Sequence, residues 1–224
     1  MMYFLLKGLL INKVRRRMRM MVIVDYGMGN LKSVQNAFAK VGYKTVITDN
    51  PNLIKKANAI ILPGVGAFRD AIKFLKDKKI DKELMDAIKA GKPFLGICLG
   101  MQLLFTFSEE GGLFDGLNII PGRVKRFPVS VKCPHLGWNK IKLINHDHHH
   151  MNPIFKDVRD ESYFYFVHSY YCEVDNSPMI YSNTDYGLLF PSSIWRDNLY
   201  GVQFHPEKSS RQGLKILKNF GELY

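Results

Sequence analysis

The sequence contains no long uninterrupted apolar run, few cysteines and no apparent cleavable secretory signal. A membrane-spanning helix needs about 18 or more apolar residues in succession, and no stretch of this chain approaches that length. The three cysteines, Cys98, Cys133 and Cys172, are an odd number at wide spacing, so a disulfide framework is not expected. We therefore expect a cytoplasmic protein without a membrane span.

Acidic residues are absent from residues 1–20, which carry two lysines and four arginines and so +6 of the formal charge of +12. The rest of the chain is only moderately basic, which argues against a nucleic-acid footprint over the whole surface. A transit-like segment and a membrane-surface helix are alternatives for this basic stretch. We favour an extension outside the core, upstream of the real start, because "MVIVDYG" from Met21 is typical of a first strand.

The remaining chain shows neither repeats nor a linker, and 224 residues with 46% hydrophobic content suit one globular domain. Four short apolar segments alternate with helix-like segments and are predicted as strands over 21–25, 44–48, 59–62 and 93–97. This alternation is typical of βαβ units. The sequence therefore predicts one α/β domain over 21–224, with a central, mostly parallel sheet flanked by helices.

Helices are predicted from Asn30 to Gly42, over 80–90 and, as a closing amphipathic helix, over 213–223. Beyond Pro121 the pattern changes to alternating aromatic and β-branched segments. They are "GWNKIKL", "YFYFVHSYY", "SSIW" and "LYGVQF". Such segments predict an antiparallel C-terminal extension of the sheet.

Cys98 stands between two glycines in "GICLG", where a predicted strand meets a predicted helix. A sharp turn that lifts a nucleophile above the carboxyl end of a sheet leaves no room for flanking β-carbons, which glycine lacks. The first amides and the dipole of the following helix would favour the thiolate and stabilise an oxyanion. The alternative is a buried small side chain between ordinary turn glycines.

A nucleophilic cysteine needs a base and an orienting group, and "GVQFHPEKSS" offers His205 and Glu207 two residues apart after an apolar segment. The two side chains share a face if Pro206 keeps the chain extended and prevents a helix. A carboxylate there would fix the tautomer of the imidazole. A surface His-Pro-Glu turn is the alternative.

An oxyanion site is expected from "ILPGVGAF", because its glycine-rich loop follows another predicted parallel strand and so lies at the same carboxyl edge. The backbone amides of Gly64, Val65 or Gly66 would pair with the amide of Leu99 around a developing negative charge. As a phosphate loop this stretch is weak, because it lacks the Lys-Ser/Thr ending.

With these motifs assembled, the chain resembles the class I, or triad, glutamine amidotransferases, whose pattern matches "GICLGMQ" and "HPE". The stretches "DYGMGNLKSV", "LPGVGAF", "PHLGWN", "YFYFVHSYY" and "GVQFHPEKSS" are similar, more narrowly, to the glutaminase subunits of imidazole glycerol phosphate synthases of histidine biosynthesis. The resemblance runs from about Met21 to the C-terminus. It implies that Cys98 attacks the glutamine side-chain amide, that His205 protonates the departing ammonia, and that Glu207 orients His205.

The resemblance also implies binding residues, but no cofactor. The amino acid end of glutamine would be held by Gly66, Gln102, Ser169 and Tyr170. The acceptor enzyme would be a separate (β/α)₈ cyclase subunit, in a heterodimer, because only seventeen residues follow Glu207. Its interface would include Asn30, Trp138, Tyr165 and Lys208.

Each of these residues has a plainer alternative. Gln102 would be an exposed helical residue, Ser169 and Tyr170 sheet positions, Trp138 and Tyr165 core aromatics, and Lys208 a solvated charge. The histidine-rich stretch His146, His148, His149 and His150 could bind a metal adventitiously. No metal site is expected, because consecutive histidines do not share one face.

Two rival functions remain open at this point. The first is an amidotransferase that serves another synthase, such as anthranilate or guanylate synthesis, and "GVGAF", "GWN" and "FVHSYY" argue against it. The second is a non-catalytic binding module with the same fold, which an intact Cys98, His205 and Glu207 argue against.

Overall fold

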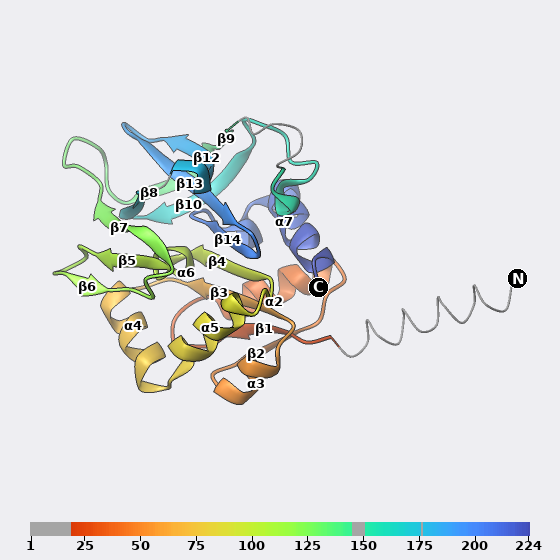
Figure 1. Cartoon of the computed structure of the whole chain (residues 1–224). Coiled ribbons are helices and arrows are strands. Elements are labelled where there is room, and N and C mark those ends of the chain that lie inside the picture. The colour runs from red at the N-terminus through yellow and green to blue at the C-terminus, as the bar shows by residue number, and fades with distance from the viewer. Residues whose placement is uncertain (1–18, 145–150, 176) are drawn as a thin grey trace, which may run out of the picture.

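The computed structural model describes residues 19–144, 151–175 and 177–224, which form one α/β domain around a large sheet (Figure 1). Within these residues the central sheet has eight strands in the order β2-β1-β3-β4-β14-β13-β12-β9. They are β1 (Met21–Val24), β2 (Thr45–Thr48), β3 (Ala59–Gly64), β4 (Phe94–Cys98), β9 (Lys142–Leu143), β12 (Ile180–Asp185), β13 (Leu189–Arg196) and β14 (Leu199–Val202). The four predicted parallel strands are confirmed as β1 to β4, which pair in parallel.

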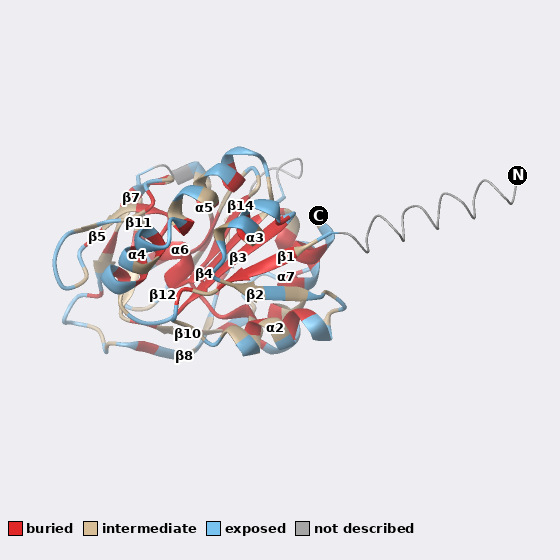
Figure 2. Ribbon diagram, turned by 90° about the horizontal axis from the view of Figure 1, so that it is seen from below, coloured by how far each residue is buried: buried red, intermediate tan, exposed pale blue. Residues whose placement is uncertain are grey.

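Helices cover both faces of this sheet. They are α2 (Leu31–Lys40), α3 (Pro51–Lys56), α4 (Phe68–Asp77), α5 (Ile80–Lys89), α6 (Leu99–Gln102) and α7 (Ser210–Glu222). The apolar sides of α3, α4 and α5 pack in one buried cluster and those of α2 and α7 in another. The inner strands β1, β3, β4 and β14 are buried between these two layers, whereas the edge strand β2 is not (Figure 2).

The first helix forms where the sequence predicts it. The side chain of Asn30 caps α2 by accepting a hydrogen bond of 3.3 Å from the amide of Ser33, and Val34 and Phe38 are buried. Gly42 follows with a φ of +94°, a conformation that glycine adopts readily. The helix over 80–90 is confirmed as α5, whereas α7 begins at Ser210, before the predicted start at residue 213.

The predicted antiparallel extension is only partly right. β12 and β13 do extend the sheet in antiparallel fashion, but other strands form two separate sheets. A two-stranded ribbon consists of β8 (His135–Lys140) and β10 (Tyr163–His168), and a four-stranded sheet of β5 (Phe105–Ser108), β6 (Phe114–Asp115), β7 (Ile120–Arg126) and β11 (Tyr170–Val174). Alternation predicts a strand and its buried face, but not the sheet that the strand joins.

Residues 1–18 of the basic extension and the histidines at 146–150 lie outside the described residues. In the described part of the chain, no helix is long and apolar enough to cross a membrane. The same residues contain no group of three or more His, Cys, Asp or Glu side chains that could hold a metal ion.

Candidate active site

Three neighbouring parallel strands bring the predicted catalytic residues to one edge of the sheet. Gly64 at the end of β3 is in register with Cys98 at the end of β4. On the other side of β4, Val202 of β14 is in register with Ile97, so the chain leaves β14 beside Cys98 on its way to His205. The carboxyl edge of such a sheet is the usual place for a ligand site.

Cys98 occupies a sharp strand-to-helix turn, with φ +54° and ψ −113°. A Cβ on Gly96 would lie 2.8 Å from the carbonyl oxygen of Gly100, and a Cβ on Gly100 would overlap the carbonyl oxygen of Leu62. Both contacts are closer than van der Waals distance, so neither Gly96 nor Gly100 has room for a side chain. The predicted steric need for glycine on both sides of Cys98 is confirmed.

The helix after Cys98 is short. α6 has only four residues, and the chain enters β5 at Phe105, because the β-prone segment "FTFS" pairs with β6 and β7 instead of continuing the helix. One turn still leaves its first amides without helical partners. It has too few aligned peptides for the dipole of a long helix, so the expected dipole effect on Cys98 is reduced.

The strand that carries Gly64 approaches the turn at Cys98 closely. A Cβ on Gly64 would collide with the hydroxyl of Tyr26 and lie 2.9 Å from the Cβ of Leu99. Gly66, two residues further, has a φ of +106°, which disfavours other residues. The backbone of the "PGVG" segment therefore runs directly over the nucleophile turn.

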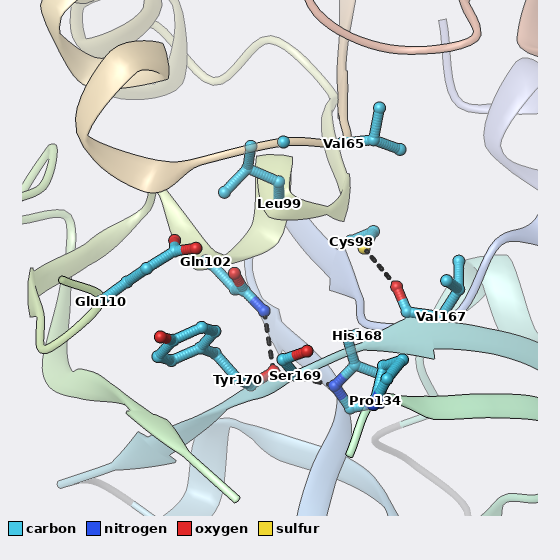
Figure 3. A pocket seen from close by; sticks show the side chains of 11 residues that line it. Val65, Cys98, Leu99, Gln102, Glu110, Pro134, Val167, His168, Ser169 and Tyr170 are labelled. Carbon is cyan, nitrogen blue, oxygen red and sulfur yellow. Dashed lines mark hydrogen bonds between the residues drawn. The ribbon is translucent and has the colours of Figure 1, made fainter.

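A cavity of about 360 Å³ opens beside Cys98 (Figure 3). Seven residues singled out from the sequence line it: Val65, Gly66, Cys98, Leu99, Gln102, Ser169 and Tyr170. Four residues that the sequence argument missed also line it: Glu110, Pro134, Val167 and His168. Gly64, His205 and Glu207 are not part of the lining, but the strand register places Gly64 beside Cys98.

His205 and Glu207 form a buried pair. The Nδ1 atom of His205 lies 2.8 Å from Oε1 of Glu207, and both side chains are almost fully enclosed. The expected extended path between them is wrong, because the 3₁₀ turn η3 (Pro206–Lys208) connects them. Proline is favoured at the first position of such a turn, where no N–H donor is needed, so Pro206 starts the turn instead of preventing it.

The charge state of His205 depends on its neighbours. Burial by itself lowers the pKa of the imidazole, but the negative charge of Cys98 and the hydrogen bonds with Cys98 and Glu207, together with the charge of Glu207, outweigh it and raise the pKa to about 10. Apart from its interaction with Cys98, the enclosed Nε2 atom has no hydrogen-bond partner among the described residues. Nε2 is thus available to exchange a proton with a bound ligand.

Gln102 is buried, so the alternative to a binding role, an exposed helical residue, is wrong. Its side chain is only 5% exposed, and its Nε2 atom donates to the carbonyl oxygen of Tyr170 and to Oε1 of Gln203, each at 3.0 Å. Gln203 is fully buried, and its own Nε2 atom lies 3.6 Å from Sγ of Cys98. The sequence signal for Gln203 is a polar residue inside the otherwise apolar segment "GVQF".

Glu110 is the one carboxylate among the described residues that line the cavity. Its Oε2 atom accepts a hydrogen bond of 2.8 Å from the amide of Phe68, the first residue of α4. Figure 3 shows its side chain on the same side of the cavity as Gln102 and Tyr170. The signal that could have identified it is the pair of acids before Gly111 and Gly112.

The outer face of the β8–β10 ribbon collects residues that were predicted to face a partner. Trp138 is 52% exposed, so the core alternative for it is wrong, and its ring centroid lies 6.1 Å from that of Tyr165. Nζ of Lys208 lies 5.6 Å from the Tyr165 centroid. Leu136 and Tyr163, which were not predicted, are exposed on the same face.

Residues 22–222, nearly the whole described chain, match the family described as Glutamine amidotransferase class-I. The chain belongs to this family. Its curated relatives in the same size range include the imidazole glycerol phosphate synthase subunit HisH of Moorella thermoacetica, 50% identical over 92% of this chain and 96% of the relative. The HisH subunit of Syntrophotalea carbinolica is 49% identical over 91% of this chain and 100% of the relative.

Solved structures agree on the amidotransferase fold. PurLQS from Thermotoga maritima superposes with a TM-score of 0.66 at 18% identity, over 91% of this chain and 98% of that chain. A glutamine amidotransferase from the same organism gives a TM-score of 0.61 at 15% identity, over 87% of this chain and 78% of that chain. At such low identity these likenesses support the fold alone.

Proposed function

We propose that this amidotransferase hydrolyses glutamine to glutamate and ammonia and passes the ammonia to a separate cyclase subunit. The cyclase would convert the ribulosyl aminoimidazole-carboxamide nucleotide to imidazole glycerol phosphate and the aminoimidazole-carboxamide ribonucleotide, in histidine biosynthesis. The observation that carries the proposal is the buried His205–Glu207 pair beside Cys98, next to a cavity. The HisH relatives, matched over almost their full length, support the assignment to this synthase over anthranilate or guanylate synthesis.

In the first step, the thiolate of Cys98 attacks the side-chain amide carbon of glutamine, and the carbonyl oxygen becomes a tetrahedral oxyanion. The amide of Leu99, at the start of α6, and the Gly64–Val65 segment that crosses the turn would donate to this oxyanion. His205, whose raised pKa keeps it protonated at neutral pH, would stabilise the negative charge of the attacking thiolate.

In the second step, Nε2 of His205 gives its proton to the leaving nitrogen, and the C–N bond breaks. Ammonia departs and a glutamyl thioester remains on Cys98. The now neutral His205 takes a proton from water, the resulting hydroxide attacks the thioester, and glutamate leaves as the thiolate returns. Glu207 orients the ring throughout through its hydrogen bond to Nδ1.

The cavity lining suits the amino acid end of glutamine. The side chains of Gln102, Ser169 and Tyr170, with the backbone at Gly66, supply polar groups on several sides. An α-ammonium group also calls for an anion, and Glu110 is the lining carboxylate among the described residues. We therefore add Glu110 to the predicted binding residues.

A partner surface is proposed on the β8–β10 ribbon, with Trp138, Tyr165 and Lys208 at its centre. Asn30 lies at the start of α2, whose Ser33 borders a cavity shared with Lys208. Exposed aromatic side chains beside a basic residue are typical of the residues that dominate protein interfaces. The compartment proposed is the cytoplasm, where the free Cys98 would stay reduced.

The proposal is tested with glutamine and with a diazoketone analogue of glutamine. Wild-type protein should release glutamate, slowly alone and faster with the cyclase and its nucleotide ligand, and the analogue should alkylate Cys98 as seen by peptide mass spectrometry. Cys98→Ala should lose at least about 1000-fold in rate because no nucleophile remains. Cys133→Ala, which removes a cysteine outside the cavity lining, is the matched control and should keep its activity. Glutamate release by Cys98→Ala at the wild-type rate would refute the mechanism.

A further inference from the structure

A chain of three hydrogen bonds runs from the nucleophile to the backbone of β11. Nε2 of Gln203 lies 3.6 Å from Sγ of Cys98, and Oε1 of Gln203 lies 3.0 Å from Nε2 of Gln102. Nε2 of Gln102 is also 3.0 Å from the carbonyl oxygen of Tyr170. Gln203 is fully buried, so water does not compete for its amide.

The carbonyl oxygen of Tyr170 fixes which group donates and which accepts in each of these three hydrogen bonds. The carbonyl oxygen of Tyr170 can only accept, so Gln102 must turn its NH₂ group toward it. The second hydrogen of that NH₂ group points to Gln203, which must therefore present its oxygen to Gln102. As a result, Gln203 directs its NH₂ group toward the sulfur of Cys98. If Gln203 turned its oxygen toward the sulfur instead, its hydrogen bond with Gln102 would be lost.

The two protonation states of Cys98 thus have different partners. A thiol can donate to the carbonyl oxygen of Val167, which lies 3.9 Å from Sγ. A thiolate cannot donate, but it accepts from the Nε2 group of Gln203. Hydrogen bonds to an ionised partner are about twice as strong as those between neutral groups. The N–H donor therefore shifts the balance toward the thiolate.

We propose that Gln203 stabilises the Cys98 thiolate through its side-chain N–H, and that Gln102 and the Tyr170 carbonyl hold the amide in the orientation that allows it. This inference rests on the proposed function in that Cys98 is the nucleophile. It assigns Gln203 a contact with the reacting sulfur, and it gives Gln102 a positioning role besides any contact with glutamine.

The test is the pH dependence of Cys98 alkylation by iodoacetamide, followed by peptide mass spectrometry with Cys133 as an internal reference. Gln203→Met has a side chain of nearly the same length, offers no donor to the thiolate and adds no charge beside the sulfur. We expect the midpoint of Cys98 alkylation to rise by about one pH unit or more, a tenfold lower rate near neutrality. Well above the midpoint, the rates of wild type and variant should converge.

Convergence separates this role from a structural one, because a packing defect would change the rate by the same factor at every pH. Gln102→Met keeps Gln203 but removes the group that orients it, and a smaller upward shift is expected. If Gln203→Met does not fold, Gln203→Leu, which also has neither a donor nor a charge, should shift the midpoint in the same direction. An unchanged midpoint in the folded Gln203 variant, or an equal loss at every pH, would overturn the inference.

The measurement uses no glutamine, so it is independent of the proposed activity. A shifted midpoint in a protein that lacks glutaminase activity would refute the proposed function while leaving the role of Gln203 intact. Normal glutaminase activity with an unchanged midpoint of Cys98 alkylation would support the proposed function and refute the role of Gln203.

Discussion

At the scale of single residues, the glycines beside Cys98 and the proline beside His205 act through what they lack. Gly96 and Gly100 have no Cβ where the backbone of another segment takes up the space. Pro206 has no N–H at the first position of a 3₁₀ turn, where none is needed. The glycines and the proline stand next to Cys98 and His205 in the sequence, so they could be read there, although the segment that fills the space at Gly100 comes from Leu62.

Residues whose contacts are distant in the chain could not be predicted in the same way. Gln203 and Cys98 are 105 positions apart and meet because β14 and β4 are neighbours in register. Glu110 reaches the cavity through a turn that lies against the first residue of α4, 42 positions earlier. Sequence patterns give the face of a strand, but they do not give its neighbour in the sheet.

The raised pKa of His205 predicts a pH profile for Glu207→Gln. The folded pKa is about 10, above the ordinary 6.5, partly because the Glu207 carboxylate stabilises the imidazolium. Replacing Glu207 with neutral glutamine should lower the pKa of His205, so the alkaline limb of kcat/KM should move to lower pH. We expect kcat to fall about 100-fold or more, since the ring also loses its orienting partner.

Glutaminase rates from pH 6 to about 10.5 would measure this shift. Glu222→Gln, a change of the same chemistry at an exposed position of α7, is the control and should leave the profile unchanged. An alkaline limb at the same pH in Glu207→Gln and wild type would show that the carboxylate does not set the charge of His205.

At the scale of elements, the β8–β10 ribbon separates two roles onto its two faces. Alternation places Trp138 and Tyr165 outward, directly opposite each other, and His135 and His168 inward, also as a pair. His168 lines the cavity, and the carbonyl oxygen of Val167 faces Cys98. The amide of His205 donates to the carbonyl oxygen of Tyr165 at 2.9 Å, so the ribbon connects directly to the catalytic base.

The ribbon should therefore be the element through which a cyclase subunit changes glutaminase activity. Trp138→Ala removes an exposed aromatic side chain from its outer face, and the concentration of cyclase needed for half-maximal stimulation should rise by about tenfold or more. The rate without cyclase should stay close to that of the wild type, because Trp138 does not line the cavity. Glutamate release measured over a cyclase titration gives both quantities.

Leu113→Ala is the control for this titration. Leu113 is 72% exposed but lies just before β6, in a different sheet from the ribbon. Its replacement should not change the titration. If Trp138→Ala also left the cyclase titration unchanged, the outer face of the ribbon would not be the docking surface.

At the scale of the whole molecule, the fold encloses two neutral histidines between the ribbon and the central sheet. Nδ1 of His135 lies 3.0 Å from Nε2 of His168, and Nδ1 of His168 donates to the carbonyl oxygen of Tyr170 at 2.8 Å. Burial lowers the pKa of His135 to about 4 and that of His168 to about 3. The hydrophobic patterns predicted the helix and sheet layers around these histidines. The contact between His135 and His168 depends on the pairing of β8 with β10 in a separate ribbon, which was not predicted.

These two histidines predict how stability changes in mild acid. In the unfolded chain both histidines have the ordinary pKa of about 6.5, whereas in the folded protein they stay neutral well below it. The unfolded state therefore binds more protons as the pH falls below about 6.5, and the free energy of unfolding must decrease. We expect the pair to account for a loss of about 1 kcal/mol or more between pH 7 and pH 5.

Urea unfolding of the wild type and of the double variant His135→Asn/His168→Gln, at pH 7, 6 and 5, would isolate this contribution. Asparagine at 135 keeps a donor where Nδ1 stood, and glutamine at 168 keeps both a donor and an acceptor, while neither titrates. All other titrating groups are common to the two proteins, so they cancel in the difference. The variant should start less stable and lose less on acidification. Parallel losses in both proteins would show that the histidines are already protonated in the fold, and the tautomers assigned to the pair would then be wrong.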